Sequence, residues 1–389
     1  MAKEDSEYLD LTQHEIHALK HEFNLADAHT HQSQSPTQRK IVESLPKLWY
    51  EAEDKMQHEM DEKFIKTFFE VQRQNYALKT PTFLFYAASI AMIAVANHLR
   101  RKNLSVSLME PSFDNIPDIM KNMGVSIKPI SEELFHDIDN LYDNLKKSVK
   151  TDAIFLIDPN NPTGFTLSGK GKYAKKGFEE LVRYAKDNNK LLLLDLCFAS
   201  FMLPDDELVI FELYELLEKS GVSYIAIEDT GKTWPLQDAK VALLKTSKDL
   251  HEEINIIHSS YLLNVSPFIL NLVTQYILDS KKDNFASVFN LLDKNREIVK
   301  REFKDTILEF QEPKSRVSVA WLKIKDPKIN ATQLQRIILK KKVYVLPGTY
   351  FYWKDHKKGE RYIRLALARN TDMFEKAVKK IKEALKEVN

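Results

Sequence analysis

Short apolar runs alternate with amphipathic segments through the middle of the chain, from about residue 81 to residue 244. A short apolar run between turn residues is typical of a buried strand, whereas apolar positions every third or fourth residue are typical of a helix. The predicted strands are 83–86, 105–109, 126–130, 153–157, 191–194, 224–227 and 239–244, and the predicted helices between them include 90–101, 113–123 and 175–187. This order predicts an α/β domain with a mostly parallel sheet and helices on both faces.

The two ends of the chain have different patterns. Residues 11–21 form a short helical pattern, with Thr12 as the expected N-cap and Glu15 at the capping-box spacing, and residues 41–71 are predicted as one long helix. After residue 244 helical patterns dominate to about residue 310, and then strands at 317–324, 343–345 and 362–366 and a helix at 373–388 predict a smaller α+β unit. We expect an N-terminal segment at 1–35, a helix of the small domain at 36–75, a large α/β domain at 76–285 and a small α+β domain at 286–389.

Composition and charge exclude several classes of protein. The 389 residues are 43% hydrophobic and 29% charged, and the formal net charge of +1 does not favour a nucleic-acid partner. A single cysteine, Cys197, excludes an intramolecular disulfide and suits a reducing cytoplasm. The first residues are too polar for a signal peptide, and the longest apolar stretch is too short and too polar for a membrane span. We therefore expect a cytoplasmic protein with no membrane association.

Polar residues follow three of the predicted strands. The strand at 153–157 is followed by Asp158-Pro-Asn-Asn-Pro-Thr-Gly164, the strand at 191–194 by Asp195, and the strand at 224–227 by Glu228-Asp-Thr-Gly-Lys232. Ligands of an open α/β sheet bind at the carboxyl ends of its strands. A lysine at such a junction points into a cleft, where its amine can form a Schiff base with an aldehyde cofactor. Taken singly, the same residues also fit a turn, a helix N-cap and a surface lysine.

The order of these residues resembles a known family. An Asn turn, an Asp and a Lys spaced 34 and 37 residues apart, as Asn161, Asp195 and Lys232 are, are similar to the fold-type I pyridoxal-phosphate (PLP) enzymes, the aspartate aminotransferase superfamily. The resemblance implies that Lys232 binds the cofactor covalently. It implies that Asp195 keeps the pyridine nitrogen protonated, so that the ring accepts electrons, and that Asn161 bonds the phenolic oxygen. By analogy with the family we also expect a homodimer.

Further positions match the family's cofactor and substrate contacts. Phe113 matches the aromatic residue that stacks on the ring, and Arg364 matches the arginine that binds the substrate α-carboxylate. Ala88 and Ser89, at the start of a predicted helix, match the phosphate-binding turn, and Lys240 stands where an arginine usually contacts the phosphate.

Two departures weaken the reading as an ordinary transaminase. Phe198 stands where aminotransferases commonly have a tyrosine, so that one hydrogen bond to the phenolic oxygen is missing. Asp229 replaces a serine or threonine near the phosphate, and because an acid repels phosphate, we expect its side chain to face a cationic substrate.

The N-terminal residues decide between the possible PLP reactions. Thr12, Glu15, Asp27 and His29, in LTQHE and NLADAHTH, resemble the N-terminal motif of the PLP- and oxygen-dependent arginine oxidases, as EDTGKTW also does. The resemblance implies that residues 1–35 form a lid, that L-arginine is the substrate and that O2 is the co-substrate. The implied substrate contacts are Glu15 and Asp229 to the guanidinium, helped by Thr12 and Asp27, while His29 either serves as an acid/base or positions water or oxygen. The products would be 4-hydroxy-2-oxoarginine or an unsaturated 2-oxo acid, with ammonia and H2O2.

Several alternatives remain open at the level of the sequence. A conventional aminotransferase that uses 2-oxoglutarate is the main rival, and a catalytically silent protein of the same fold is another. His14, His17 and His21 share one helical face; because nothing completes a metal site, we expect a solvated lid face and no metal. Arg361 and Arg369 are expected to be surface charges.

Overall fold

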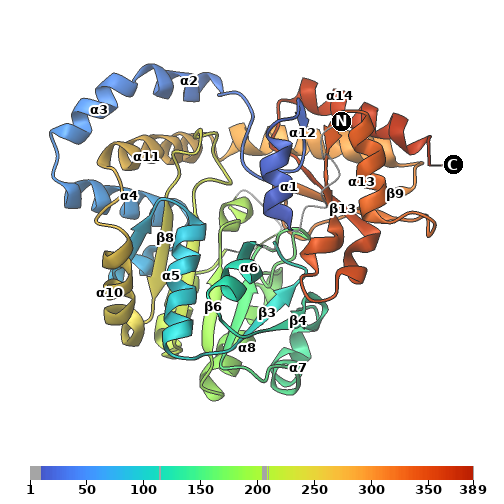
Figure 1. The fold of residues 1–389 in the computed structure, drawn as a ribbon. Helices are drawn as coiled ribbons and strands as arrows, with labels where there is room; N and C mark the ends of the chain where they lie inside the picture. The colour runs from blue at the N-terminus through green and yellow to red at the C-terminus, as the bar shows by residue number, and fades with distance from the viewer. Residues whose placement is uncertain (1–9, 114, 204–207, 209, 389) are drawn as a thin grey trace.

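The computed structural model describes residues 10–113, 115–203, 208 and 210–388. Figure 1 shows a central sheet with helices on both sides and a second unit, orange to red, that is built mainly from the C-terminal part of the chain. The described residues begin at Asp10, so positions 1–9 of the predicted N-terminal segment lie outside them.

The central sheet contains each of the seven predicted strands, in the order β2-β8-β7-β6-β5-β3-β4. Strands β3 to β7 run parallel, and β8 is antiparallel to its neighbours β7 and β2. The bounds are β2 (Thr82–Phe85), β3 (Val106–Glu110), β4 (Ile127–Ser131), β5 (Ala153–Ile157), β6 (Leu191–Asp195), β7 (Tyr224–Asp229) and β8 (Ala242–Thr246). β5 is apolar along its whole length because helices cover both faces of the sheet. The predicted α/β fold class is confirmed.

Helices of the large unit connect and cover these strands. They are α5 (Ala88–Arg101), α6 (Asn115–Asn122), α7 (Leu141–Ser148), α8 (Lys176–Asp187), α9 (Leu213–Ser220), α10 (His251–Tyr261) and α11 (Pro267–Lys282). Short 3-10 helices occur in both units, at η1 (Asn75–Lys79), η2 (Glu132–Phe135), η3 (Ile138–Asn140), η4 (Gly171–Tyr173), η5 (Ala199–Met202), η6 (Lys248–Leu250), η7 (Gly348–Phe351) and η8 (His356–Arg361).

The smaller unit is an antiparallel sheet of order β12-β13-β10-β9 with helices packed beside it. Its strands are β9 (Leu308–Gln311), β10 (Val319–Ile324), β12 (Leu346–Pro347) and β13 (Tyr362–Ala366), and its helices are α12 (Ala286–Phe303), α13 (Ala331–Lys340) and α14 (Thr371–Leu385). The pattern of the sequence did not predict β9. The run predicted at 343–345 ends one residue earlier as β11 (Val343–Tyr344), which pairs in parallel with β1 (Phe23–Asn24), a strand that was not predicted either.

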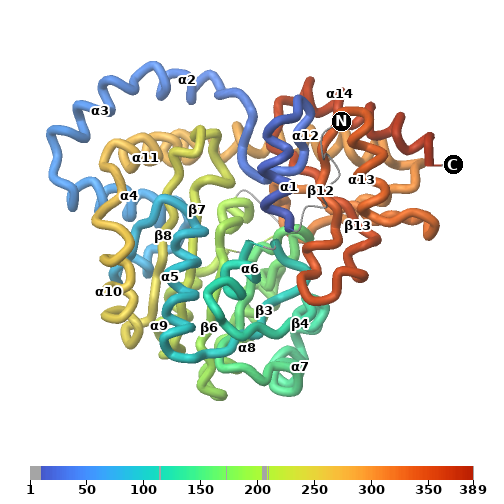
Figure 2. The backbone as a smooth tube through the Cα atoms, in the orientation of Figure 1, coloured from blue at the N-terminus to red at the C-terminus, as the bar shows by residue number. Residues whose placement is uncertain are grey.

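The N-terminal segment lies against the smaller unit, as Figure 2 shows. Helix α1 (Leu11–Ala18) is shorter than predicted, and its N-cap is Asp10, whose carboxylate accepts from the Gln13 backbone N–H. The predicted capping box of Thr12 and Glu15 is therefore wrong. Both residues lie within the helix, so their side chains are available for other contacts.

Residues 36–75 differ most from the prediction. They form three helices, α2 (Pro36–Glu43), α3 (Leu45–Glu53) and α4 (Gln57–Val71), in place of one. Pro46 lies at the start of α3, where its missing N–H costs no helical hydrogen bond, so it begins a new helix. α3 and α4 pack against α11 of the large unit, away from the small domain to which this segment was assigned. Among the described helices, none is both long and apolar enough to cross a membrane.

Candidate active site

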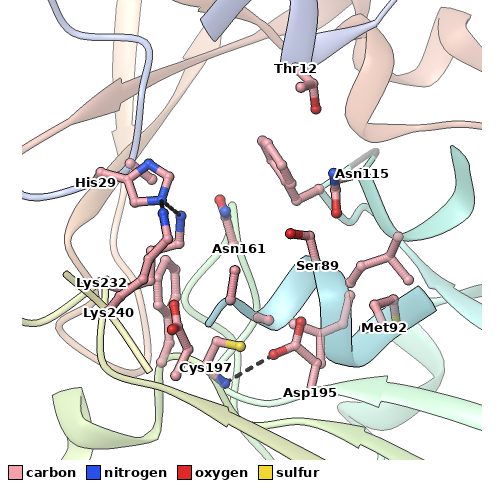
Figure 3. Close-up of a pocket in the computed structure, with 18 of the residues that line it drawn as sticks. Thr12, His29, Ser89, Met92, Asn115, Asn161, Asp195, Cys197, Lys232 and Lys240 are labelled. Atoms are coloured by element: carbon pink, nitrogen blue, oxygen red, sulfur yellow. Dashed lines mark hydrogen bonds between the residues drawn. The ribbon is translucent and has the colours of Figure 1, made fainter. Parts of the chain in front are cut away.

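A cavity of about 220 Å³ opens at the carboxyl ends of β5, β6 and β7. It lies between the large unit and helix α1, and most of the predicted site residues line it (Figure 3). These are Thr12, Glu15, His29, Ala88, Ser89, Phe113, Asn161, Asp195, Asp229, Lys232 and Lys240. Two further predicted residues, Asp27 and Arg364, are not among the lining residues but contact residues that are.

Asp195 is the last residue of β6 and lies at the floor of the cavity. One carboxylate oxygen accepts from the Cys197 backbone N–H at 2.9 Å. Burial raises the pKa of Asp195; the neighbouring Asp229 carboxylate adds to this effect and Lys232 opposes it. A cationic group placed beside Asp195 would offset that cost of desolvation.

Lys232 follows β7 by three residues, and its side chain points along one side of the cavity toward His29 (Figure 3). Its Nζ lies 3.2 Å from Nε2 of His29, and Nζ of Lys240 lies at the same distance from that nitrogen. A Cβ on Gly231 would come within 2.7 Å of Cδ of Lys240, so the close approach of this turn to Lys240 depends on glycine. The amines of Lys232 and Lys240 thus lie together at one end of the cavity.

The start of α5 forms an opposite wall of the cavity. Ala87, Ala88 and Ser89 line it, and the N-cap Ala87 supplies no side-chain hydrogen bond to the first turn of the helix. Helix N–H groups and the helix dipole favour an anion at such an end. The N–H groups of this turn and the Ser89 hydroxyl therefore fit a phosphate group, and Lys240 is a cation in the lining of the same cavity.

Asp27 and two histidines form a hydrogen-bonded cluster beside the cavity. Nδ1 of His29 lies 2.6 Å from one carboxylate oxygen of Asp27, and Nε2 of His31 lies 2.6 Å from the other. Burial acts to raise the pKa of Asp27, but the hydrogen bonds from the two histidines outweigh it and hold that pKa well below its ordinary value. Asp27, predicted to bind substrate, instead supports His29.

Arg364, on β13, joins three parts of the molecule. Its fully buried guanidinium donates to Oδ1 of Asn161 at 3.0 Å, to Oε1 of Glu15 at 2.9 Å and to the carbonyl of Ala26. It also lies over the ring of Phe113, with 5.7 Å from Cζ to the ring centroid. The predicted carboxylate-binding arginine therefore already holds a carboxylate, that of Glu15 on α1.

Two other arginines are not the surface charges that were expected. Arg369 is buried and donates to the carbonyls of Asn24, Asp27 and His29 at 2.6–2.9 Å, which fastens the N-terminal segment to the small domain. Arg361 is half-buried and donates to the carbonyls of Ile329 and Asp326. Carbonyl partners distant in sequence leave no local signal, so neither role was visible in the pattern.

The face that carries His14, His17 and His21 is only partly solvated, in contrast to the solvated face that was expected. His14 is buried, with Nδ1 2.8 Å from the hydroxyl of Tyr344, and the rings of His17 and His21 pack against the same tyrosine. Burial lowers the pKa of His14 to about 4. Within the part of the chain that the structure describes, no group of three or more His, Cys, Asp or Glu residues is placed to hold a metal ion.

The cavity residues fit PLP in charge and position. The turn at Ala88 and Ser89 suits the phosphate, Asp195 suits a protonated ring nitrogen, and Lys232 suits covalent attachment. In addition, Oδ1 of Asp229 is buried without a hydrogen-bond partner in the described structure. A buried carboxylate oxygen of this kind calls for a donor from a ligand.

Comparisons with known proteins show the family and the fold of this chain. Residues 54–381 match the family model described as aminotransferase class I and II, and the chain belongs to that family. Its fold is similar to a solved structure of MppP soaked with the product 2-ketoarginine, at a TM-score of 0.84 and 29% identity, over 93% of this chain and 99% of that one. Thermus thermophilus aspartate aminotransferase with maleate shares the fold, at a TM-score of 0.75, 13% identity and 97% of each chain.

The curated relatives include ordinary aminotransferases. The aromatic-amino-acid aminotransferase 2 of Thermococcus litoralis and the aspartate aminotransferase of Pyrococcus abyssi are each 23% identical over 251 residues, which is 63% of this chain. The match spans 60% of the length of each relative.

Proposed function

We propose that this protein is a PLP-dependent enzyme that oxidises L-arginine with O2. The products are 4-hydroxy-2-oxoarginine, an unsaturated 2-oxo acid, or both, with release of ammonia and H2O2. Either product is a four-electron oxidation, so each turnover reduces two molecules of O2 to two of H2O2. The observation that carries the proposal is that Thr12, Glu15 and His29 of the N-terminal segment line the same cavity as Lys232 and Asp195. The likeness to MppP supports it.

PLP would be held by the residues that fit it. Lys232 attaches it covalently, Asp195 faces its ring nitrogen, Phe113 stacks on the ring and Asn161 bonds the phenolic oxygen. The phosphate lies at Ala88 and Ser89, near Lys240. When bound, the cofactor supplies an electrophilic carbon for the substrate amine and a ring that accepts electrons from the substrate.

The substrate is selected by charge at both of its ends. Arg364 binds the α-carboxylate, for which its planar fork is suited. Glu15 and Asp229 bind the guanidinium, and Thr12 adds a hydrogen bond. Burial raises the pKa of Glu15 and the Arg364 guanidinium opposes this, so the carboxylate depends on a cationic partner. A guanidinium bound beside Glu15 provides such a partner.

Proton transfers are handled at the Lys232 end of the cavity. The amine of Lys232 would accept the α-proton, and Nε2 of His29 lies within reach of its Nζ. The N-terminal segment shields this end from bulk water, which limits stray protonation of the oxidised substrate. We propose that the enzyme works as a homodimer, as its family usually does.

A second candidate function is a conventional aminotransferase that uses 2-oxoglutarate. It is favoured by the names of the curated relatives, and Asn161, Asp195, Lys232 and Arg364 are compatible with either function. Phe198 lines the cavity where a tyrosine is common, and this favours the oxidase.

One experiment separates the two candidates. Purified holoenzyme is mixed with L-arginine in air, and dissolved O2 and the masses of the 2-oxo acids are followed. The oxidase consumes O2 without 2-oxoglutarate and forms H2O2. Glutamate formed only after 2-oxoglutarate is added, with O2 unchanged, identifies an aminotransferase.

A further inference from the structure

We propose that His31 is a positioning residue that acts on His29 through Asp27. The inference rests on the proposed function only in taking His29 as the acid/base of the site. His31 is not among the residues that line the main cavity. It lines a separate cavity of about 40 Å³, which it shares with His29, Trp234 and Lys240, and its side chain is 40% exposed.

Asp27 is held on all of its polar atoms. Oδ1 accepts from the backbone N–H and from Nδ1 of His29, while Oδ2 accepts from Nε2 of His31. The carbonyl of Asp27 accepts from Arg369. The Asp27 side chain is 7% exposed, so a carboxylate that lost one of these donors would remain largely out of reach of solvent.

These contacts set the tautomer of His29. An ionised carboxylate only accepts hydrogen bonds, so each imidazole nitrogen that faces Asp27 carries a proton. Neutral His29 is then protonated on Nδ1 and has its lone pair on Nε2, the nitrogen that lies 3.2 Å from Nζ of both Lys232 and Lys240. Nε2 can therefore accept a proton from the lysine end of the cavity, which the other tautomer cannot do.

The charged groups around His29 make this orientation depend on Asp27. Lys232 and Lys240 face Nε2, and Asp238 pairs with Lys240 at 3.0 Å on the outer side. His31 holds Oδ2 and the backbone N–H of His29 holds Oδ1, and together these two donors keep the carboxylate in the orientation that presents Oδ1 to Nδ1 of His29. Loss of an orienting partner behind a reacting histidine typically costs about tenfold or more in activity.

The test uses two variants of His31 and a matched control. His31→Ala removes the hydrogen bond to Asp27, whereas His31→Gln keeps a neutral donor. His58→Ala removes another exposed histidine, on α4, which packs on the far side of the large unit. Cofactor-free protein labelled with ¹⁵N-histidine reports the tautomer of His29 by NMR, with His29→Gln to assign the signal, and thermal unfolding checks that each variant folds.

The expected result is a spectroscopic change that follows the hydrogen bond. Wild type, His58→Ala and His31→Gln keep the proton of His29 on Nδ1, whereas His31→Ala shows a mixture of tautomers. In the holoenzyme, His31→Ala lowers the kcat for arginine-dependent O2 uptake about tenfold, while its KM stays within about twofold of the wild-type value. His31→Gln keeps most of the wild-type kcat.

Two outcomes overturn the inference. An unchanged His29 tautomer in His31→Ala, or a kcat equal to that of His58→Ala, shows that His31 is only a surface residue. If His31→Ala does not fold, a His31→Gln variant that folds but loses both signatures excludes a hydrogen-bonding role. Failure of the proposed function is distinguishable, because wild type would then consume no O2 with arginine while the NMR test still reports on His31.

Discussion

The guanidinium of Arg364 donates to the carboxylate of Glu15 at 2.9 Å, with the arginine side chain fully buried and the glutamate side chain 13% exposed. Under the proposed function these residues bind opposite ends of one arginine molecule, yet here they bind each other. The substrate α-carboxylate must therefore replace Glu15 on Arg364. Glu15, once displaced, needs a new cation in a buried site, and the substrate guanidinium supplies it. This exchange of partners couples recognition of the two ends of the substrate.

Glu15→Gln should weaken recognition of the guanidinium end of the substrate and leave the carboxylate end to Arg364. The amide still fits beside Arg364 but no longer attracts the guanidinium, so the KM for L-arginine should rise about tenfold, the loss of one charge-assisted hydrogen bond of roughly 1.4 kcal/mol. The preference for L-arginine over L-norleucine, which has no guanidinium, should fall by a similar factor. Steady-state O2 uptake with both amino acids measures it, with Ile16→Ala on the exposed side of α1 as control. An unchanged preference would show that Glu15 does not contact the guanidinium.

Lys232→Ala should abolish covalent binding of the cofactor. Purified wild type should be yellow, and the variant should lose the absorption of lysine-bound PLP because it lacks the amine that forms the Schiff base. Lys240→Ala is the matched control: it removes a cation near the phosphate, so the protein should stay yellow but bind PLP about tenfold more weakly. A Lys232→Ala protein that remained yellow with an unchanged spectrum would refute the assignment of Lys232 and leave the silent-protein alternative standing.

The docking of α1 should weaken as the pH falls. Burial against Tyr344 lowers the pKa of His14 to about 4 from its ordinary value of 6.5. Protonation of His14 is therefore less favourable in the docked helix than in a released one. Docking has its full strength above pH ~6.5. Between that pH and about 4, the equilibrium constant for docking falls by up to about tenfold per pH unit.

Hydrogen exchange of residues 11–18 as a function of pH measures this effect. Protection should fall with decreasing pH in wild type and be flatter in His14→Gln, which cannot be protonated. Asp10 acts in the opposite direction on the His14 pKa, so Asp10→Asn should strengthen the pH dependence. Equal pH dependence in wild type and His14→Gln would exclude His14 as its source.

Arg369→Lys should loosen the N-terminal segment although the charge is kept. A lysine cannot reproduce the three bonds of the guanidinium to the carbonyls of Asn24, Asp27 and His29. We expect a loss of about 2–4 kcal/mol in the free energy of unfolding. Limited proteolysis should cut within residues 24–31 sooner than in wild type. The exposed Arg39→Lys on α2 is the control, and equal rates of cleavage would contradict the role of Arg369.

The sequence predicted the central sheet and the chemistry at its edge, because both depend on local patterns. Runs such as β5 and β6 are apolar enough to be found without a structure, and Asn161, Asp195 and Lys232 lie at the end of a strand or within four residues of one. Partners that are distant in sequence were not predictable in this way. The pairing of Arg364 with Glu15 joins residues 349 positions apart, and only the packing of the N-terminal segment on the small domain brings them together.

Local signals also misled where tertiary contacts outweigh them. Thr12 has the residue type and spacing of an N-cap, but Asp10 takes that role and leaves Thr12 facing the cavity. The stripe of His14, His17 and His21 resembles a solvated face, but the ring of Tyr344 packs against it and His14 is buried. In both places the surroundings of the side chains come from distant parts of the chain, which no local pattern reports.

Asp229→Asn provides the most direct test of the substrate. Asp229 is buried at the end of β7, and its Oδ1 has no hydrogen-bond partner in the described structure, so the protein carries the cost of an unsatisfied carboxylate oxygen. If that oxygen binds the guanidinium of the substrate, the isosteric amide should raise the KM for L-arginine about tenfold or more while PLP remains bound. Thermal stability of the ligand-free variant should be unchanged or higher, because a buried charge has been removed. Calorimetric binding of L-arginine and O2 uptake measure the first effect, and a thermal melt measures the second. A variant with lower stability and an unchanged KM would mean that Asp229 serves the fold or the cofactor, and the cationic substrate would then have to be sought elsewhere in the cavity.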